Sequence, residues 1–88
     1  MNKIRRKELA KIVAKLETLE ALRSEIQEEL EAIMEEEQEA LDNMPESLQD
    51  SEKGQQMQEY LDAMESALDD LEEIDIDSIR EQIDDIVG

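Results

Sequence analysis

Residues 43–51 read NMPESLQDS and separate two long runs in which apolar side chains recur at helical spacing. Pro45 cannot continue a helix that precedes it, and it disfavours helical geometry at Met44. Asn43 belongs to a residue type that commonly ends helices. The stretch therefore predicts that one helix ends near residue 42 and that a turn follows over residues 43–50.

The same stretch carries start signals for a second helix, which we expect over residues 51–73. Ser47 with Asp50, or else Asp50 or Ser51 alone, can accept hydrogen bonds from the first free backbone amides of that helix. Its predicted apolar stripe has steps of three and four residues and consists of Met57, Leu61, Met64, Leu68 and Leu71. Two long helices joined by a short connection become antiparallel neighbours.

The first helix is predicted over residues 4–42, with the alternating three- and four-residue steps of a coiled-coil seam. The predicted seam consists of Leu9, Ile12, Leu16, Leu19, Arg23, Ile26, Leu30, Ile33, Glu37, Ala40 and Met44. Beside it lie Val13, Leu22, Met34 and Leu41, which widen the stripe and indicate more than one neighbour. Arg23 and Glu37 either extend their charges to solvent or pair across the seam, or they set the register of the helices.

After residue 73 the phase of the apolar pattern shifts. Ile76, Ile79, Ile83 and Ile86 form a stripe of their own, which predicts a short third helix over residues 77–87. Asp75 or Asp77 would cap it. The alternative is one continuous helix with a stutter in the heptad pattern.

The length of 88 residues favours a single helical domain, residues 1–88. We predict an all-α fold: a long antiparallel helical hairpin with a short C-terminal third helix. A core built almost entirely from aliphatic side chains in so small a chain is thin, and the sequence has no cysteine with which to form disulfides. We therefore expect the hairpin to form a homodimer, which completes a helical bundle.

Charge is unevenly distributed. The chain has 27 Asp and Glu against 9 Lys and Arg, a net charge of −18. Residues 1–16 carry six basic side chains against Glu8, a net charge of +5, so the remainder carries −23. Antiparallel pairing would place the basic start beside an acidic segment and neutralise Asp69, Asp70, Glu72, Glu73, Asp75 and Asp77.

The composition argues against an enzyme. The chain has no histidine and no cysteine, the usual bases and nucleophiles of covalent catalysis and the usual zinc ligands. Its only glycines, Gly54 and Gly88, cannot form a glycine-rich phosphate loop. We expect no cofactor, no metal, no small-molecule substrate, no membrane span and no signal peptide, and hence a cytoplasmic location.

The segment DNMPESLQ at residues 42–49, followed by SEKG at 51–54, resembles a hairpin in small acidic coiled-coil proteins encoded by phages, prophages and Firmicutes genomes. The similarity is close over the turn and compositional over the helices. The resemblance implies a phage or mobile-element setting, and hence a bacterial host cell. It implies no catalytic activity.

The acidic helices predict a basic partner. Side by side, residues 17–42 and 52–77 carry about one carboxylate per 1.9 Å of axis, close to the value of about 1.7 Å for duplex DNA. The protein is therefore interpreted as a DNA mimic that inhibits a host nuclease or defence protein, of anti-CRISPR or anti-restriction type, without binding nucleic acid itself. The predicted partner-binding residues are Glu28, Glu31, Glu35, Glu39, Glu59, Asp62, Asp69, Asp70 and Glu73. The alternative is a homo-oligomeric coiled-coil adaptor or structural protein whose acidity only provides solubility.

Overall fold

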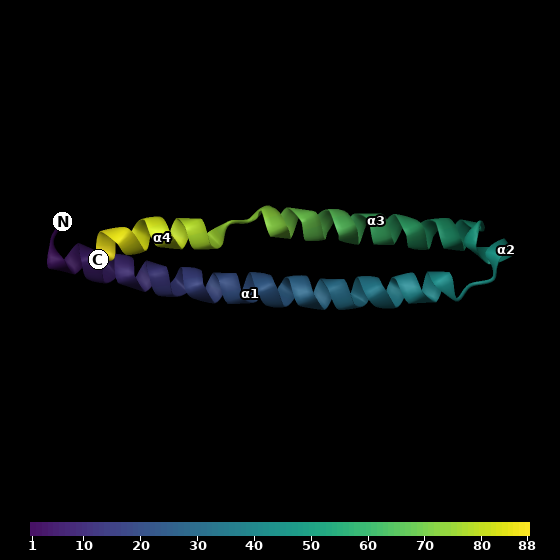
Figure 1. Cartoon of the computed structure of the whole chain (residues 1–88), viewed down its shortest axis with the longest axis horizontal. Helices are drawn as coiled ribbons and strands as arrows, with labels where there is room; N and C mark the ends of the chain where they lie inside the picture. Colours follow the sequence, from purple (N-terminus) through teal and green to yellow (C-terminus); the bar gives the residue numbers. More distant parts are fainter. The chain divides into compact units, whose positions relative to one another are not determined.

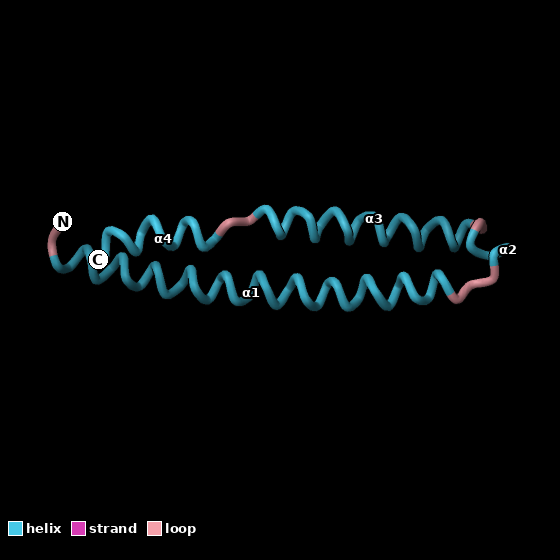
Figure 2. The backbone as a smooth tube through the Cα atoms, in the orientation of Figure 1, coloured by secondary structure: helices cyan, strands magenta, loops and turns pink.

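A computed structural model describes all 88 residues and contains helices and no strands (Figure 1). The all-α prediction is confirmed. The helices, in chain order, are α1 (Lys3–Asp42), α2 (Glu46–Gln49), α3 (Glu52–Glu73) and α4 (Ile76–Val87). The segments between them are short, as Figure 2 shows.

The chain divides into two compact units. Met1–Glu25 and Ile74–Gly88 form one, here called the terminal unit, and Ile26–Glu73 form the other, here called the turn unit. In the terminal unit the first part of α1 lies beside α4, and in the turn unit the second part of α1 lies beside α3 (Figure 1). Each unit is thus a pair of antiparallel helices. Folding of the whole chain as one domain stays a prediction.

The two ends of α1 have different causes. At the start, the side chain of Asn2 accepts a hydrogen bond from the backbone amide of Arg5 at 2.8 Å, which satisfies one free donor of the first turn. At the other end, no residue except glycine has a positive φ, so Asn43 does not end the helix in the left-handed conformation. Pro45, whose ring is incompatible with a continuing helix, accounts for that end.

The predicted turn over residues 43–50 is wrong in one respect, because it contains the short helix α2. The carbonyl of Pro45 accepts hydrogen bonds from the amides of Leu48 at 2.8 Å and Gln49 at 3.1 Å. Pro45 is the N-cap of α2: its backbone is extended, with φ −57° and ψ 145°, while its carbonyl already accepts the first hydrogen bonds of the helix. The residue that ends α1 therefore also starts α2.

α3 starts directly after α2, and the two helices touch at Gly54. Ser51 caps α3: its hydroxyl accepts a hydrogen bond from the amide of Gly54 at 3.4 Å and donates one to the carbonyl of Leu48. A Cβ atom on Gly54 would lie 2.1 Å from the carbonyl oxygen of Gln49, far inside contact distance. Only glycine permits this close approach, which the spacing of residues in the sequence does not predict.

The break between α3 and α4 is present, which excludes the continuous helix with a stutter. α3 ends at Glu73 and α4 begins at Ile76. Of the two candidate caps the structure uses Asp75, whose carboxylate accepts a hydrogen bond from the amide of Ser78 at 3.0 Å.

The buried core is small. Val13 and Ile76 are buried in the terminal unit, and Leu41, Leu61 and Leu68 in the turn unit. The predicted stripe of α3 is the observed one, since each of its members is buried or half-buried. The three buried apolar side chains of the turn unit come from α1 and α3, so the antiparallel pair is held by facing apolar side chains.

On α1 the predicted seam is wrong at alternate positions. The observed seam consists of the buried or half-buried residues Leu9, Val13, Leu16, Glu20, Arg23, Gln27, Leu30, Met34, Glu37 and Leu41, and it continues to Met44 just after the helix; Ser24 and Glu31, beside this seam, are half-buried as well. From Leu9 the predicted seam continues to position 12 and the observed seam to position 13, which lie about 50° to either side of Leu9 around the helix. The predicted and the observed seam therefore both alternate steps of three and four residues. Periodicity cannot distinguish them, because the side on which the partner helix packs decides. On α4 the same error places Ile79 and Ile86 in the seam, whereas both are about half exposed.

Candidate functional site

The turn unit carries nearly all of the excess charge. It contains 18 Asp and Glu and a single basic residue, Lys53, a net charge of −17. The terminal unit has nine acidic and eight basic side chains, a net charge of −1. All nine residues predicted to bind a partner lie in the turn unit, so the structure brings them into one compact body.

Within the turn unit the charge spacing matches that of duplex DNA. Residues 26–42 of α1, about 25 Å long, carry eight carboxylates, and the 17 residues 57–73 of α3 carry seven. Side by side this gives about one charge per 1.7 Å, the value for the axis of duplex DNA. Neither stretch contains a Lys or Arg.

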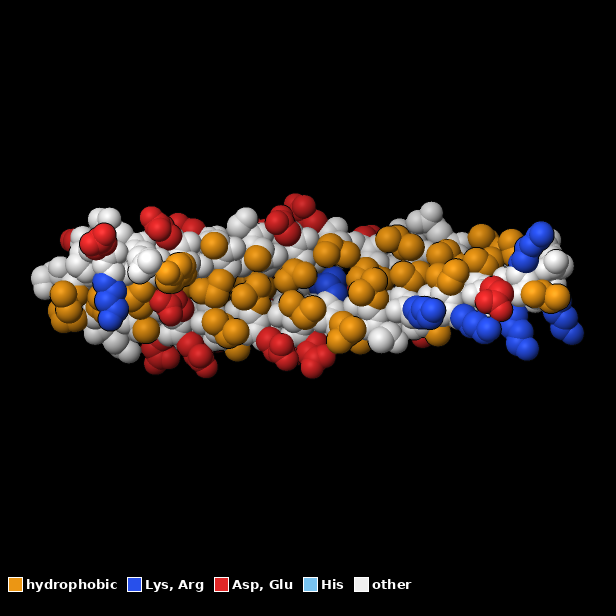
Figure 3. Space-filling model, turned by 180° about the vertical axis from the view of Figure 1, so that it is seen from behind, with side chains coloured by type: hydrophobic (Ala, Val, Ile, Leu, Met, Phe, Trp, Pro, Cys, Tyr) orange, Lys and Arg blue, Asp and Glu red, His pale blue; other side chains and the backbone are white.

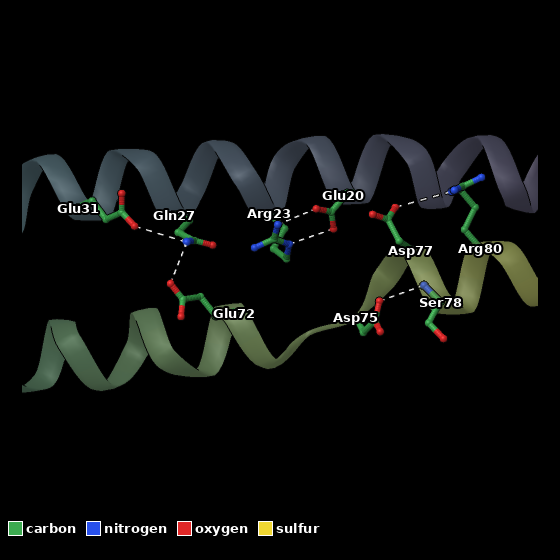
Figure 4. Close-up of polar contacts among 9 residues, drawn as sticks. All are labelled: Glu20, Arg23, Gln27, Glu31, Glu72, Asp75, Asp77, Ser78 and Arg80. Carbon is green, nitrogen blue, oxygen red and sulfur yellow. Dashed lines mark hydrogen bonds and ion pairs between the residues drawn. The ribbon is translucent and has the colours of Figure 1, made fainter.

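Eight of the nine predicted residues are exposed, as expected of a binding surface, and Glu31 is the exception. Glu31 is half-buried and accepts a hydrogen bond from the side-chain amide of Gln27 at 3.4 Å (Figure 4). The same amide donates to Glu72 of α3 at 3.3 Å. Glu31 therefore does not point outward as predicted; it lies beside the polar link between α1 and α3.

A shallow groove runs between α1 and α3 on the side of this link. Its lining residues are Met34, Glu35, Gln38, Gln58, Leu61, Asp62 and Glu65. Glu35 and Asp62 face it from opposite helices, and the side chain of Gln58 donates to Asp62 at 3.1 Å. Heptad phase places Glu28 and Asp69 on this side as well, because Glu28 lies seven residues, about two turns, before Glu35, and Asp69 lies seven residues after Asp62.

The remaining predicted residues lie elsewhere on the turn unit. By the same phase, Glu39, Glu59, Asp70 and Glu73 point away from the groove. The nine residues therefore do not form one patch. The groove and its neighbouring carboxylates are the candidate site, which we call the acidic groove: Glu28, Glu35, Asp62, Glu65 and Asp69.

The carboxylates of the turn unit form no ion pairs. The ion pairs of the chain are Lys11 with Glu8, Arg23 with Glu20, and Arg80 with Asp77, each within one helix of the terminal unit. The expected neutralisation of the acidic segment is not found at residues 69–73, because none of these carboxylates forms an ion pair. No ion pair involves Lys3, Arg5, Arg6, Lys7 or Lys15.

Arg23 occupies a seam position of α1 and binds Glu20 of the same helix through two hydrogen bonds, at 2.9 and 2.6 Å (Figure 4). The hydrogen bond from Arg23 lowers the pKa of Glu20 below its ordinary value of 4.5, and the positive charge of Arg23 adds to this effect. Partial removal of Glu20 from water opposes it. The pair satisfies two charges that would otherwise be costly in a seam.

Glu20→Gln is expected to make the free energy of unfolding less dependent on pH. A carboxyl whose pKa is lowered by folding stabilises the fold above its ordinary pKa, and this stabilisation is lost as the pH falls through the lowered value. The wild-type chain should therefore exceed the variant in urea midpoint at pH 7, with the difference shrinking below pH 4.5. A difference that stays constant between pH 7 and pH 3 would show that the ion pair contributes nothing.

Other kinds of site are not found in the structure. No group of carboxylates is arranged so that it could hold a metal ion. None of the helices combines the length and the apolar character that crossing a membrane requires. No protein-family model, curated protein or solved structure matches the chain.

Proposed function

We propose that the chain is a non-enzymatic interaction protein whose turn unit takes the place of DNA in the basic channel of a nucleic-acid-binding protein. The setting we propose is a phage or mobile element in a bacterial cytoplasm, and the partner a host nuclease or defence protein, as for anti-CRISPR or anti-restriction inhibitors. The observation that carries the proposal is the spacing of carboxylates along α1 and α3, about one per 1.7 Å with no cation among them.

The affinity would come from the same source as that of DNA. A protein that binds DNA gains most of its sequence-independent affinity by neutralising phosphates with Lys and Arg, which releases bound counterions. A helix pair of the same charge spacing offers the channel the same gain. The turn unit also gains, because a basic channel relieves the repulsion among carboxylates that form no ion pair within the chain.

Capture from a bacterial lysate tests the proposal. The immobilised chain should retain a basic protein at 50 mM NaCl and release it when duplex DNA is added, since both compete for one channel. The combined variant Glu28→Gln, Glu35→Gln, Asp62→Asn, Asp69→Asn should lose the protein.

A matched control removes the same number of charges outside the acidic groove: Glu39→Gln, Glu59→Gln, Asp70→Asn, Glu73→Gln. It should retain most of the binding. If duplex DNA in excess fails to release the captured protein, mimicry of DNA is refuted.

The second candidate function is a homo-oligomeric coiled-coil adaptor or structural protein, favoured by the apolar side chains that α1 leaves exposed. An adaptor should tolerate Glu35→Gln and Glu39→Gln but lose function when Leu30 or Leu68 is replaced. Both candidates share one element of the proposal, namely that the protein acts as a homodimer.

A further inference from the structure

α1 carries a second apolar stripe outside its seam. Ile12, Leu19, Ile26 and Ile33 follow one another at intervals of seven residues, and they are 43%, 49%, 48% and 55% exposed. An interval of seven keeps them on one line along the helix. The corresponding positions on the other flank of the seam are polar: Glu17, Ser24, Glu31 and Gln38. One flank of α1 is therefore apolar over four heptads and lacks a partner.

The helices that pair with α1 extend this stripe within each unit. In the terminal unit Ile79 and Ile86 of α4 are 49% and 46% exposed, and in the turn unit Tyr60 of α3 is 52% exposed. Each occupies the same heptad flank of its own helix as Ile12 does on α1. Two antiparallel helices are related by a two-fold axis that is perpendicular to the plane containing both. This axis exchanges the helices without turning the pair over, so the same heptad flank of each helix lies on the same face of the pair. Figure 3 shows apolar side chains gathered on such a face.

The chain exposes more surface than a compact folded protein of its mass. The accessible surface is 6763 Å². A folded monomer of 10.2 kDa exposes about 5,300 Å². The excess, about 1,400 Å², is larger than the roughly 800 Å² that each partner buries in a typical stable complex. In addition, no large side chain is less than 2% exposed, so the core is incomplete in the single chain.

We propose that a second copy of the chain covers this face, with the two α1 helices antiparallel and a two-fold axis passing beside Leu22. This inference rests on the proposed homodimer and names its surface and its orientation. The stripe is symmetric about the midpoint of α1, between residues 22 and 23. Antiparallel packing about that point places Ile12 against Ile33 of the second copy, and Leu19 against Ile26.

The edge of the stripe fits the same axis. Leu22 lies outside both the seam and the stripe and is 49% exposed. In the antiparallel dimer it meets Leu22 of the second copy on the axis, so an otherwise unexplained apolar side chain becomes buried. Lys15 and Glu29 lie on the same edge of α1, seven residues before and after Leu22, and carry opposite charges. In the antiparallel dimer Lys15 of one copy lies next to Glu29 of the second copy. Parallel packing would instead place Lys15 against Lys15 and Glu29 against Glu29.

The distribution of charge favours the same orientation. The first turns of α1 carry five cations without an ion pair, whereas residues 26–42 carry eight carboxylates and no cation. Antiparallel packing brings the basic start of each α1 to the acidic half of the other. This attraction reduces the repulsion between two chains that each carry −18.

Cysteine cross-linking tests the surface and the orientation together, because the chain has no cysteine of its own. At 50 μM the wild-type chain should have a mass of about 20 kDa in light scattering, twice 10.2 kDa. Under mild oxidation the Leu22→Cys variant should become a covalent dimer. The Glu36→Cys variant should not, because antiparallel packing separates its two cysteines by 28 residues of helix, about 42 Å. A mixture of Lys15→Cys and Glu29→Cys should give the mixed disulfide.

Each contrary result overturns a defined part of the proposal. A mass of 10.2 kDa at 50 μM would refute the dimer, and covalent dimers of both Leu22→Cys and Glu36→Cys would refute the antiparallel orientation. A mass that rises only when a basic protein is added would assign the face to a different partner. None of these measurements involves DNA competition, so the inference can fail while the proposed function stands, or the reverse. The four-residue acidic-groove variant should remain dimeric.

Discussion

Replacing Gly54 with alanine is expected to lower the free energy of unfolding by about 2 kcal/mol or more, the cost of inserting a methyl group into a filled space. The added Cβ would lie 2.1 Å from the carbonyl oxygen of Gln49 and 2.6 Å from that of Leu48. Both are backbone atoms, so relief requires α2 to move away from α3. For a chain of this size the melting temperature should fall by roughly 8–16 °C.

The sign of this effect makes Gly54→Ala informative. In a helix with free space around the glycine, alanine stabilises by about 1 kcal/mol, because glycine loses more backbone entropy on folding. Lys53→Ala, at the exposed neighbouring position, is the control and should change the melting temperature by only a few degrees. If circular dichroism shows a higher melting temperature for Gly54→Ala, then α2 does not pack against α3 as described.

Leu41→Ala is expected to cost about 2–4 kcal/mol, because it removes a buried side chain from the small core of the turn unit. Ile33→Ala, on the outer stripe, should cost about 1 kcal/mol or less in the monomer, since Ile33 is 55% exposed and Leu41 is 8% exposed. Both should be measured by urea unfolding in a Leu22→Glu background, which places a charge on the proposed two-fold axis and keeps the chain monomeric. If Leu41→Ala and Ile33→Ala lower the free energy of unfolding equally, the seam predicted from the sequence is supported and the observed seam is refuted.

The helices themselves follow from local chemistry, and the sequence predicts them well. Pro45 marks the end of α1 because its ring excludes a continuing helix wherever the chain goes. Asp75 and the change of apolar phase around it mark the break before α4, because both act within a few residues. The predicted helices over residues 4–42, 51–73 and 77–87 differ from the observed ones by one residue at each start.

The parts that the sequence does not predict depend on which side of α1 its partners occupy. Leu9 is flanked by apolar side chains at positions 12 and 13, so the pattern fits a partner on either side. The error at Glu31 has the same origin, because a shift of the seam turns that position toward α3. A hint was present in the sequence: Ile12, Leu19, Ile26 and Ile33 form an apolar line beside the seam, which fits a second interface.

Two features of the structure could not be found from the spacing of residues alone. The close approach at Gly54 depends on the fold of α2, which a turn prediction does not specify. The division of charge into −17 and −1 depends on which residues pack together, whereas the sequence shows only that the first sixteen residues are basic. The overall acidity and the carboxylate spacing, by contrast, follow from counting residues along two helices.

The central claim, that the turn unit binds a basic channel as DNA does, is tested most directly by the salt dependence of its affinity. The measurement is the dissociation constant of the captured basic protein at 50 and 200 mM NaCl, with duplex DNA measured in parallel. For a channel that makes six or more contacts with carboxylates, we expect the affinity to fall by about 1,000-fold, with a slope like that for DNA. An affinity that stays the same at both salt concentrations would contradict the claim.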